Sequence, residues 1–254
     1  MTDENMLRTV SKPLPLQGAD NTRDLGGYET SHGYKTAPHR FLRSDSLEAL
    51  SASDIELLKE YGVGCCIDFR TEEVCRKTPS RLQNVDGIAY YNVPIDDHLG
   101  HVNLSELFEY ADMGELYIEF LKRNSQEFRE ALRIVLRYRN QTVIYHCAAG
   151  KDRTGIFTML LLKLAGVSED LIYRDYQATE YYMRSKFSKI REALAALHQK
   201  APDYVFSSAP EQLEKAVNYL ETEYGSIEGY LQSIGMTGEE CAELSLLLKP
   251  DDAM

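Results

Sequence analysis

The sequence predicts an α/β fold, with a mainly parallel central sheet flanked by helices and a helical C-terminal elaboration. Three observations lead to this prediction. Short apolar runs alternate with segments of helical periodicity, which is typical of strand–helix units built around a parallel sheet. With 254 residues and 43% hydrophobic content, the chain is long enough to bury a substantial core. Beyond Gly166 nearly every segment has a helical pattern.

The first half of the chain contains the pattern of an arm, a helix and two strands. We expect residues 1–20 to form an extended N-terminal arm, because Pro13 and Pro15 disfavour a helix. The segment SASDIELLKEYG predicts a capped helix that ends at Gly62. The runs VGCCIDF and IAYYNVPI then predict two buried strands.

The second half begins with a long helical pattern over residues 114–140, which we expect to be broken near Asn124. The strand TVIYH follows, then a short loop and the helix DRTGIFTMLLLKLAG, which should end at Gly166. No linker composition separates the remaining residues from this unit. We therefore expect residues 21–254 to form one domain, in which residues 167–250 are the helical elaboration.

Composition excludes several classes of function. The net charge of −12 argues against broad nucleic-acid binding, which needs a basic face, although a small basic pocket for an anion remains compatible with it. No run of about 18 apolar residues predicts a membrane span, and MTDENMLRTV lacks the apolar region of a secretory signal. Five scattered cysteines indicate neither a zinc site nor a disulfide framework. A reduced cytoplasm is the default expectation, and export without a signal peptide would leave no trace in the sequence.

Two stretches place an arginine six residues after a cysteine. In CRKTPSR, Cys75 precedes Arg81, and in HCAAGKDR, Cys147 precedes Arg153. The first stretch has no glycine, and Pro79 removes a backbone donor that an anion would need. It also follows a charged segment instead of a strand. We therefore expect Cys75 to be an ordinary side chain on a helix or loop.

The second stretch joins a predicted strand to a predicted helix, a geometry that favours anion binding. Its small residues let successive backbone N–H groups curl around a tetrahedral anion, and the helix N-terminus adds its dipole. Arg153 can hold two oxygens with its guanidinium fork. The same field favours the thiolate of Cys147, to which Thr154 can donate its hydroxyl, and His146 can brace the loop. The expected anion-binding residues are Ala148, Ala149, Gly150, Lys151, Thr154 and Gly155.

Cys147 has two other interpretations. Free cysteines are often small buried hydrophobes that end a strand. A sulfur carrier of the rhodanese type also places a cysteine in an anion-binding loop, but such loops usually differ in length and lack the RTG ending. The combination of arginine, glycine and helix start favours a nucleophile that attacks phosphorus.

The motif HCAAGKDRTG resembles the phosphate-binding loop of the atypical bacterial tyrosine-protein phosphatase family, some members of which also act on phosphoserine, phosphothreonine or phosphoinositides. The blocks NTRDLGGY, RFLRSDSLEALSASD, IDFRTEEV and EYGSIEGYLQSIGMT extend the resemblance over most of the chain. The resemblance implies that Cys147 becomes a phosphocysteine and that Arg153 binds phosphate and the transition state. It implies no metal and no cofactor.

The residue that acts as general acid remains open between two positions. Many cysteine phosphatases carry an aspartate on a separate loop upstream, where this chain has Asp96 and Asp97. The atypical family instead uses the aspartate inside the loop, here Asp152, which we favour. Lys151 is either a second cation that broadens substrate choice or an exposed lysine at a loop tip. Ala148 replaces the lysine of some dedicated lipid phosphatases, which weakens a lipid-only interpretation.

Three arginines and one basic helix have alternative interpretations. The arginines could ring the pocket, but we favour a structural role in which they pair with nearby aspartates: Arg23 with Asp24, Arg43 with Asp45, and Arg70 with Asp68. The segment YYMRSKFSKIREAL predicts a basic amphipathic helix. It could touch anionic lipid or act as a lid, although a solvated helix face is the favoured interpretation.

Together these observations predict a metal-independent protein-tyrosine phosphatase whose partner is a phosphotyrosine protein or peptide. No nucleic acid and no stable membrane insertion are expected. The alternatives are a phosphoinositide or inositol-phosphate phosphatase that uses the same chemistry, and a phosphotyrosine-binding module without turnover. The presence of Cys147, Asp152 and Arg153 together argues against the last of these.

Overall fold

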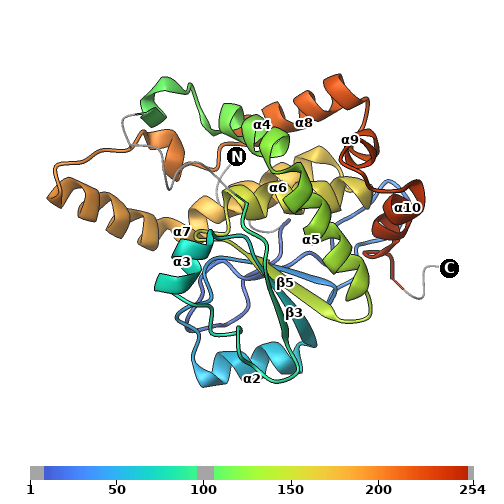
Figure 1. The fold of residues 1–254 in the computed structure, drawn as a ribbon, viewed down its shortest axis with the longest axis horizontal. Helices are drawn as coiled ribbons and strands as arrows, with labels where there is room; N and C mark the ends of the chain where they lie inside the picture. Colours follow the sequence, from blue (N-terminus) through green and yellow to red (C-terminus); the bar gives the residue numbers. More distant parts are fainter. Residues whose placement is uncertain (1–8, 96–105, 251–254) are drawn as a thin grey trace.

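The computed structural model describes residues 9–95 and 106–250. Within these residues the strands are β1 (Arg23–Asp24), β2 (Phe41–Ser44), β3 (Val63–Asp68), β4 (Ala89–Asn92) and β5 (Thr142–His146). They form a five-stranded sheet in the order β1-β2-β5-β3-β4 (Figure 1). All neighbouring strands are parallel except β1, which pairs antiparallel with β2 at one edge. The predicted α/β class with a mainly parallel sheet is confirmed.

Helices cover both faces of the sheet. The helices of the first half are α2 (Ala52–Glu60), α3 (Glu72–Lys77), η1 (Glu106–Glu109), α4 (Met113–Arg123) and α5 (Ser125–Arg137). Those of the second half are α6 (Asp152–Leu164), α7 (Glu169–Ala196), η2 (Asp203–Phe206), α8 (Pro210–Tyr224), α9 (Ile227–Ser233) and α10 (Gly238–Leu246). Figure 1 shows α2 on one side of the sheet and α5 and α6 on the other.

The central strands are buried on both faces. Their successive side chains point to opposite faces of the sheet, and an apolar core covers each face. Cys65 of β3 and Val143 of β5 belong to the larger apolar core, which also contains side chains of α4, α5, α6 and α8. Their neighbours Cys66 and Ile144 belong to a smaller core that includes Leu58 of α2. Two packed layers therefore hold the carboxyl ends of β3 and β5 in place.

Local sequence explains where α2 begins and ends. Ser51 caps the N-terminus of α2, and the Asp54 side chain accepts a hydrogen bond from the backbone N–H of Ser51. These two bonds form a capping box. The Asp54 carboxylate also accepts hydrogen bonds from the backbone N–H groups of Gln17 and Gly18, and so fastens the N-terminal segment to α2. Gly62, with φ of +93°, follows the helix end as predicted.

The helical elaboration at the C-terminal end packs on the rest of the chain. α8 lies along α4, and α10 lies against α5 and α6. α7 is 28 residues long and extends beyond the sheet (Figure 1). The predicted break at Asn124 is confirmed, since α4 ends at Arg123 and α5 begins at Ser125. The division into arm, domain and elaboration boundaries stays a prediction.

Two strands differ from the sequence-based expectation. β4 lies at the sheet edge, and its residues are half-buried instead of buried. β2 was not predicted as a strand because Arg43 and Ser44 interrupt its apolar pattern, yet both are buried and hydrogen-bonded. Among the described residues, no helix combines the length and apolar character needed to cross a membrane.

Candidate active site

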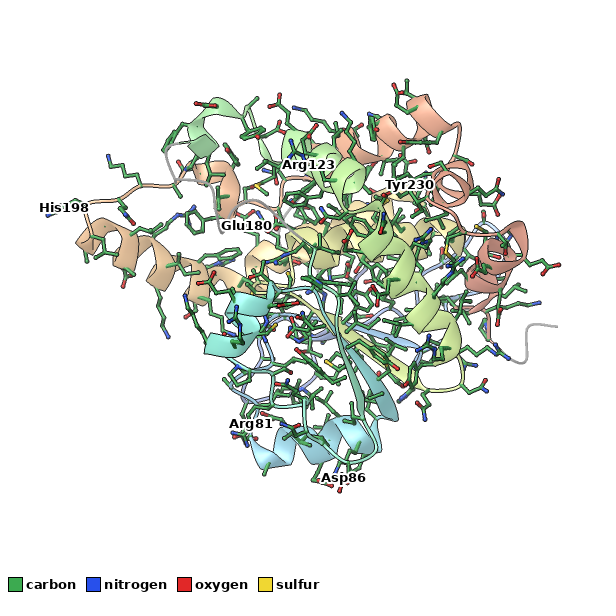
Figure 2. All side chains as sticks on the ribbon, in the orientation of Figure 1. Arg81, Asp86, Arg123, Glu180, His198 and Tyr230 are labelled. Atoms are coloured by element: carbon green, nitrogen blue, oxygen red, sulfur yellow. The ribbon has the colours of Figure 1, made fainter. Side chains whose placement is uncertain are left out.

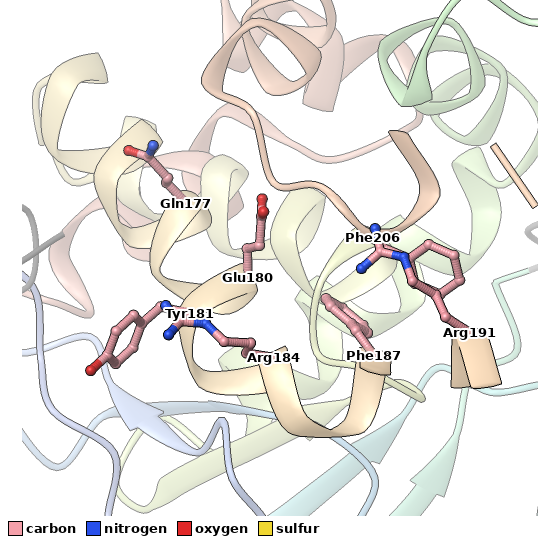
Figure 3. Close-up of a pocket in the computed structure, with 7 residues that line it drawn as sticks. All are labelled: Gln177, Glu180, Tyr181, Arg184, Phe187, Arg191 and Phe206. Carbon is pink, nitrogen blue, oxygen red and sulfur yellow. The ribbon is translucent and has the colours of Figure 1, made fainter. Parts of the chain in front are cut away.

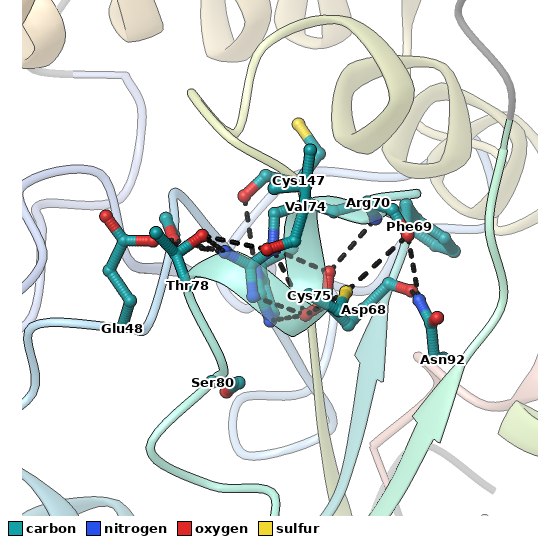
Figure 4. A network of polar contacts seen from close by, with 12 residues as sticks. Glu48, Asp68, Phe69, Arg70, Val74, Cys75, Thr78, Ser80, Asn92 and Cys147 are labelled. Atoms are coloured by element: carbon teal, nitrogen blue, oxygen red, sulfur yellow. Dashed lines mark hydrogen bonds and ion pairs between the residues drawn. The ribbon is translucent and has the colours of Figure 1, made fainter. Parts of the chain in front are cut away.

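The loop that follows β5 is the centre of the candidate site. β5 lies between β2 and β3, with both of which it is parallel, and its chain continues through residues 147–151 into α6. Ligands of open α/β sheets bind at the carboxyl ends of such strands. Cys147 is 1% exposed, and Figure 4 shows its sulfur pointing away from the polar network beneath the loop.

Three successive carbonyl oxygens of this loop point outward and accept hydrogen bonds. Ala148 O accepts from the Ser46 N–H at 3.0 Å, Ala149 O from Asn21 Nδ2 at 3.0 Å, and Gly150 O from Arg43 Nη2 at 2.7 Å. The N–H of a trans peptide points opposite to its C=O. The N–H groups of residues 149–151 therefore face the inside of the loop, where an anion can accept from them.

The loop also requires glycine at one position. Gly150 has φ of +65°, and a Cβ there would lie 2.5 Å from the carbonyl oxygen of Ser44. This close approach holds the loop against the end of β2. Any larger side chain would have to displace backbone atoms, so the predicted role of Gly150 in shaping the loop has a steric basis.

The residues of the first turn of α6 are buried around the loop. Arg153 is 8% exposed, and its Nη1 donates to the carbonyl oxygen of Phe69 at 3.2 Å. The hydroxyl of Thr154 is buried and makes no hydrogen bond to any residue that the structure describes. The bond from Thr154 to the sulfur of Cys147, expected from the sequence, is therefore not formed.

A buried carboxylate beneath Cys147 accepts hydrogen bonds from two neighbouring segments of the chain (Figure 4). Asp68, at the end of β3, accepts hydrogen bonds from Arg70 Nη2 at 2.7 Å and from the Tyr90 hydroxyl at 2.9 Å. Burial would raise the pKa of Asp68, but His146 and Arg70 lower it below its usual value. The predicted pair of Arg70 with Asp68 is confirmed.

His146 braces the start of the loop, as expected. Its Nδ1 lies 3.2 Å from the carbonyl oxygen of Cys147, and its Nε2 lies 3.3 Å from Oδ2 of Asp68. Burial lowers the pKa of His146, and Asp68 offsets this only in part. Because His146 is then neutral at pH 7, Arg70 is the cation that stabilises the Asp68 carboxylate there.

The other cysteine–arginine stretch has no such site. Cys75 lies on α3, and its thiol donates to Oδ2 of Asp68 at 3.5 Å. Burial and then the Asp68 carboxylate raise the pKa of this thiol, which disfavours a thiolate. Arg81 is exposed at the surface. The prediction that Cys75 lies on a helix or loop is confirmed, and its lack of a catalytic role stays a prediction.

The structural role favoured for Arg23 and Arg43 is confirmed, but their predicted partners Asp24 and Asp45 were wrong. Both arginines are buried and pair with Asp175 of α7: Arg23 Nη2 lies 3.2 Å from Oδ1, and Arg43 Nη1 pairs with Oδ2. The two predicted carboxylates instead accept hydrogen bonds from backbone N–H groups of nearby turns. Sequence proximity failed here because the fold brings Asp175, which is 152 positions from Arg23 and 132 positions from Arg43, next to both.

Lys151 is not an exposed lysine at a loop tip, so that interpretation was wrong. Its side chain is 1% exposed, and its ammonium donates to the carbonyl oxygens of Val205 at 2.6 Å and Ser207 at 2.9 Å. The same ammonium lies 3.2 Å from Oδ1 of Asp152. Lys151 therefore joins the loop to the segment that contains η2.

Asp152, the favoured general acid, lies at the start of α6 with its side chain 19% exposed. The hydroxyl of Tyr117, from α4, lies 2.6 Å from its Oδ1. Sequence reasoning missed Tyr117, because no motif in the sequence connects α4 to the loop. Asp96 and Asp97 lie outside the described residues, so the choice between them and Asp152 stays open.

A hollow lies near the loop, on the basic face of α7 (Figure 3). It has a volume of about 180 Å³, and Figure 3 shows the side chains of Arg184 and Arg191 at it. Arg184 stacks on Tyr181 at 4.7 Å, and Arg191 stacks on Phe206 at 4.3 Å. Phe206 belongs to a small apolar cluster against which Ala149 packs, and this places the hollow near the loop. The lipid-contact, lid and solvated-face interpretations of this helix stay predictions.

Comparison with known proteins identifies the family. The model of the tyrosine phosphatase family matches residues 14–249. A tyrosine-protein phosphatase of Nostoc commune is 29% identical over 82% of this chain and 74% of that protein. The triple specificity protein phosphatase PtpB of Mycobacterium tuberculosis is 26% identical over 87% of this chain and 94% of that protein.

Two further similarities are more limited. An inositol diphosphatase of Oryza sativa subsp. japonica is 40% identical over 52 residues, which cover 20% of this chain and 26% of that protein. The crystal structure of TpbA from P. aeruginosa is 13% identical over 78% of this chain and 87% of that chain, with a TM-score of 0.37 that is too low to inform the fold. The match over residues 14–249 is decisive, and the chain belongs to the tyrosine phosphatase family, as its resemblance predicted.

Proposed function

We propose that this protein hydrolyses phosphomonoesters through a phosphocysteine intermediate and acts first on phosphotyrosine in proteins. The observation that carries this proposal is the orientation of the loop after β5. Its outward carbonyl oxygens direct the N–H groups of residues 149–151 inward. Arg153 adds a guanidinium at the same loop, which lies directly after Cys147 in the chain.

In the first step the Cys147 thiolate attacks phosphorus, so that a P–S bond forms as the P–O bond to the tyrosine breaks. The inward N–H groups and Arg153 stabilise the charge on the phosphoryl oxygens, which is the main demand of phosphoryl transfer. Asp152 gives a proton to the departing phenolic oxygen. The leaving group therefore departs as a neutral phenol.

In the second step a water molecule attacks the phosphocysteine. Asp152, now a carboxylate, takes a proton from this water as a new P–O bond forms and the P–S bond breaks. Inorganic phosphate is released, and the thiolate of Cys147 is regenerated. The cycle uses side chains and backbone groups of this chain alone.

One second candidate has an observation in its favour. The 52-residue similarity to an inositol diphosphatase supports inositol phosphates as substrates for the same chemistry. Comparing kcat/KM for a phosphotyrosine peptide with kcat/KM for short-chain phosphoinositides and for inositol phosphates tests the choice. A higher value for either inositol class than for the peptide would replace the proposed substrate, while the cysteine chemistry would remain.

The two cysteine–arginine stretches supply a matched test of the nucleophile. We expect Cys147→Ser to reduce hydrolysis of para-nitrophenyl phosphate by more than about a thousandfold, because a neutral hydroxyl replaces a thiolate. The control Cys75→Ser should retain turnover. Wild-type protein that binds vanadate without turnover would instead be a phosphotyrosine-binding module. Equal activity of the two variants would contradict the proposed nucleophile.

The predicted cytoplasmic location, and the absence of nucleic-acid and membrane partners, belong to this proposal as expectations. Fractionation of the native cells with an antibody to the protein tests the location. Protein in the medium of intact cells would show export.

A further inference from the structure

The hollow on the basic face of α7 lies between two elements of the helical elaboration (Figure 3). One wall is formed by α7, from which Arg184 and Arg191 line the hollow, and Phe206 of η2 lines the other. Its volume of about 180 Å³ exceeds many times the roughly 15 Å³ that one water molecule needs, so a small polar side chain fits inside it. None of its described lining residues belongs to the catalytic loop.

The hollow and the loop border the same apolar cluster. Phe187 and Phe206 belong to this cluster and also line the hollow, and Ala149 of the loop packs against the cluster. The ammonium of Lys151 donates to the carbonyl oxygens of the residues on either side of Phe206, at 2.6 and 2.9 Å. A group that enters the hollow is therefore separated from the loop by this cluster, and Lys151 fixes the two relative to each other.

Both arginines of the hollow are held by aromatic rings. The guanidinium of Arg184 lies 4.7 Å from the ring centre of Tyr181. The guanidinium of Arg191 lies 4.3 Å from the ring centre of Phe206. Stacking uses the flat face of a guanidinium, whereas its N–H groups lie in the plane of the group and point to its edge. An arginine held in this way loses less conformational freedom when an anion binds to it.

The acidic groups near the hollow do not cancel this preference for an anion. Glu180 lines the hollow, but its Oε2 accepts hydrogen bonds from the Ser207 hydroxyl at 3.1 Å and the Ser208 N–H at 2.8 Å. Asp203 lies 3.6 Å from Arg191 and its side chain is fully exposed, so this surface pair is weak and another carboxylate can replace it. Two arginines and one glutamate leave the described lining positively charged, in a chain with a net charge of −12.

We propose that this hollow binds an acidic side chain of the substrate protein, two or three positions from the phosphotyrosine. This inference rests on the proposed function, in which a phosphotyrosine protein occupies the loop. An extended chain advances about 3.3 Å per residue, so two or three residues span roughly 7–10 Å, enough to cross one layer of side chains. The hollow would then select substrates by their sequence.

Arg191 is the residue that binds the acidic side chain. Arg184 and Arg191 are seven positions apart on α7, which is about two helical turns, so one carboxylate contacts only one of them. Arg191 stacks on Phe206, a member of the cluster that borders the loop. Arg184 adds positive charge to the hollow and so favours the same anion from a greater distance.

The test compares phosphotyrosine peptides that differ only in charge. One peptide carries glutamate at the second and third positions on both sides of the phosphotyrosine, a second carries glutamine there, and a third carries lysine. In wild type we expect kcat/KM to be about three- to fivefold higher for the glutamate peptide than for the glutamine peptide, the effect of one partly exposed charge pair. The preference should decline at high salt.

Variants of Arg191 separate binding of the acid from a structural role. The Arg191 side chain is half-exposed, so its variants should fold. Arg191→Gln should remove most of the preference and leave kcat/KM for para-nitrophenyl phosphate unchanged, because this substrate is too small to reach the hollow. Arg191→Glu should reverse the preference, so that the lysine peptide is hydrolysed best. A merely structural role in holding Phe206 would lower kcat/KM for all peptides alike and would not reverse their order.

Arg139→Gln is the matched control, because it makes the same change in net charge away from the hollow. Arg139 is 56% exposed, pairs with Glu243 at 2.9 Å and precedes β5, at the sheet edge opposite the loop. This variant should keep the full preference for the glutamate peptide. If it loses as much of the preference as Arg191→Gln, the preference comes from the net charge and the proposal is overturned.

The outcomes distinguish failure of this inference from failure of the proposed function. If wild type hydrolyses the three peptides with equal kcat/KM, the hollow does not select an acid, and the phosphatase activity stands. If it hydrolyses para-nitrophenyl phosphate but no peptide, the protein substrate and this inference are both overturned. Sedimentation with vesicles of phosphatidylserine and phosphatidylcholine tests another occupant. Vesicle binding that is lost in Arg191→Gln, with no change in peptide preference, would assign the hollow to lipid and overturn the proposal.

Discussion

Asp175→Asn is expected to destabilise the fold and weaken phosphate binding together. Asp175 is fully buried and is the carboxylate shared by Arg23 and Arg43. The Tyr28 hydroxyl also donates to it at 2.9 Å. An asparagine keeps the shape of the side chain but removes the charge that two buried guanidinium groups face.

The magnitude follows from the burial of the three charged groups. Breaking one buried ion pair costs about 3–5 kcal/mol, because a charge is left without its partner. Here Arg23 and Arg43 are at most 1% exposed and both lose the same partner, so we expect the upper part of that range. Domains are stable by about 5–15 kcal/mol, so the variant should fold with a much lower free energy of unfolding.

The effect on the site has a direct route. Arg43 also donates to the carbonyl oxygen of Gly150 at 2.7 Å, one of the bonds that turn the loop N–H groups inward. Without Asp175, Arg43 loses the carboxylate that holds it in position. We therefore expect vanadate affinity to fall together with stability.

Urea unfolding of wild type and variant measures the difference, and titration with vanadate measures the site. The control is Asp170→Asn on the same helix, because Asp170 is 65% exposed and pairs with Arg174 at 2.8 Å. Such a surface pair contributes about 0.5 kcal/mol or less. Equal losses in the two variants would refute the reasoning.

The pH dependence of the free energy of unfolding tests the same ion pairs of Asp175. Although burial would raise the pKa of Asp175, Arg43 and Arg23 lower it below its usual value. The contribution of Asp175 to stability is therefore complete above about pH 4, the pKa of an aspartate in the unfolded chain. It is lost as the pH falls through the lower pKa of Asp175 in the folded protein. The stability gap between wild type and Asp175→Asn should narrow at acid pH. A gap that widens below pH 4 would contradict the assignment.

Two further predictions concern the loop and the residue before it. Gly150→Ala should abolish vanadate binding, because the new Cβ would lie 2.5 Å from the carbonyl oxygen of Ser44. Gly27→Ala is the control and should retain binding, since Gly27 also has a positive φ but its Cβ would meet nothing within 4 Å. Calorimetric titration with vanadate compares the two variants. Burial, offset in part by a neighbouring carboxylate, lowers the pKa of His146, so its contribution to stability is complete above about pH 6.5 and declines below it by up to ~1.4 kcal/mol per pH unit. Urea unfolding from pH 5 to 8 should show this component in wild type and not in His146→Asn, and an unchanged slope would disprove it.

The fold class could be predicted because hydrophobic periodicity is a local property. The apolar runs around Cys65 and Ile144 indicate strands buried on both faces, and the break near Asn124 marks the end of a helix. β2 could not be predicted, because its burial depends on hydrogen-bond partners of Arg43 and Ser44 that lie elsewhere in the chain. Local pattern cannot report such partners.

The candidate site also has a part that could be predicted from the sequence and a part that could not. The loop from Cys147 to Arg153 was predictable because its residue types, its glycine and its place between strand and helix are contiguous in the sequence. The outer contacts of the loop were not, since Asn21 is 128 positions from Ala149. Sequence reasoning could have found Asn21 only through the NTRDLGGY block that resembles the family.

By itself, the sequence determined the α/β class and the family, and it supplied the prediction of Cys147 over Cys75, because these depend on short-range order along the chain. The tertiary structure decided which carboxylate neutralises the buried arginines and which tyrosine reaches Asp152. Those contacts join α7 and α4 to the loop across a folded core. A charge or a hydroxyl finds such partners by distance in space, and separation along the chain does not specify that distance.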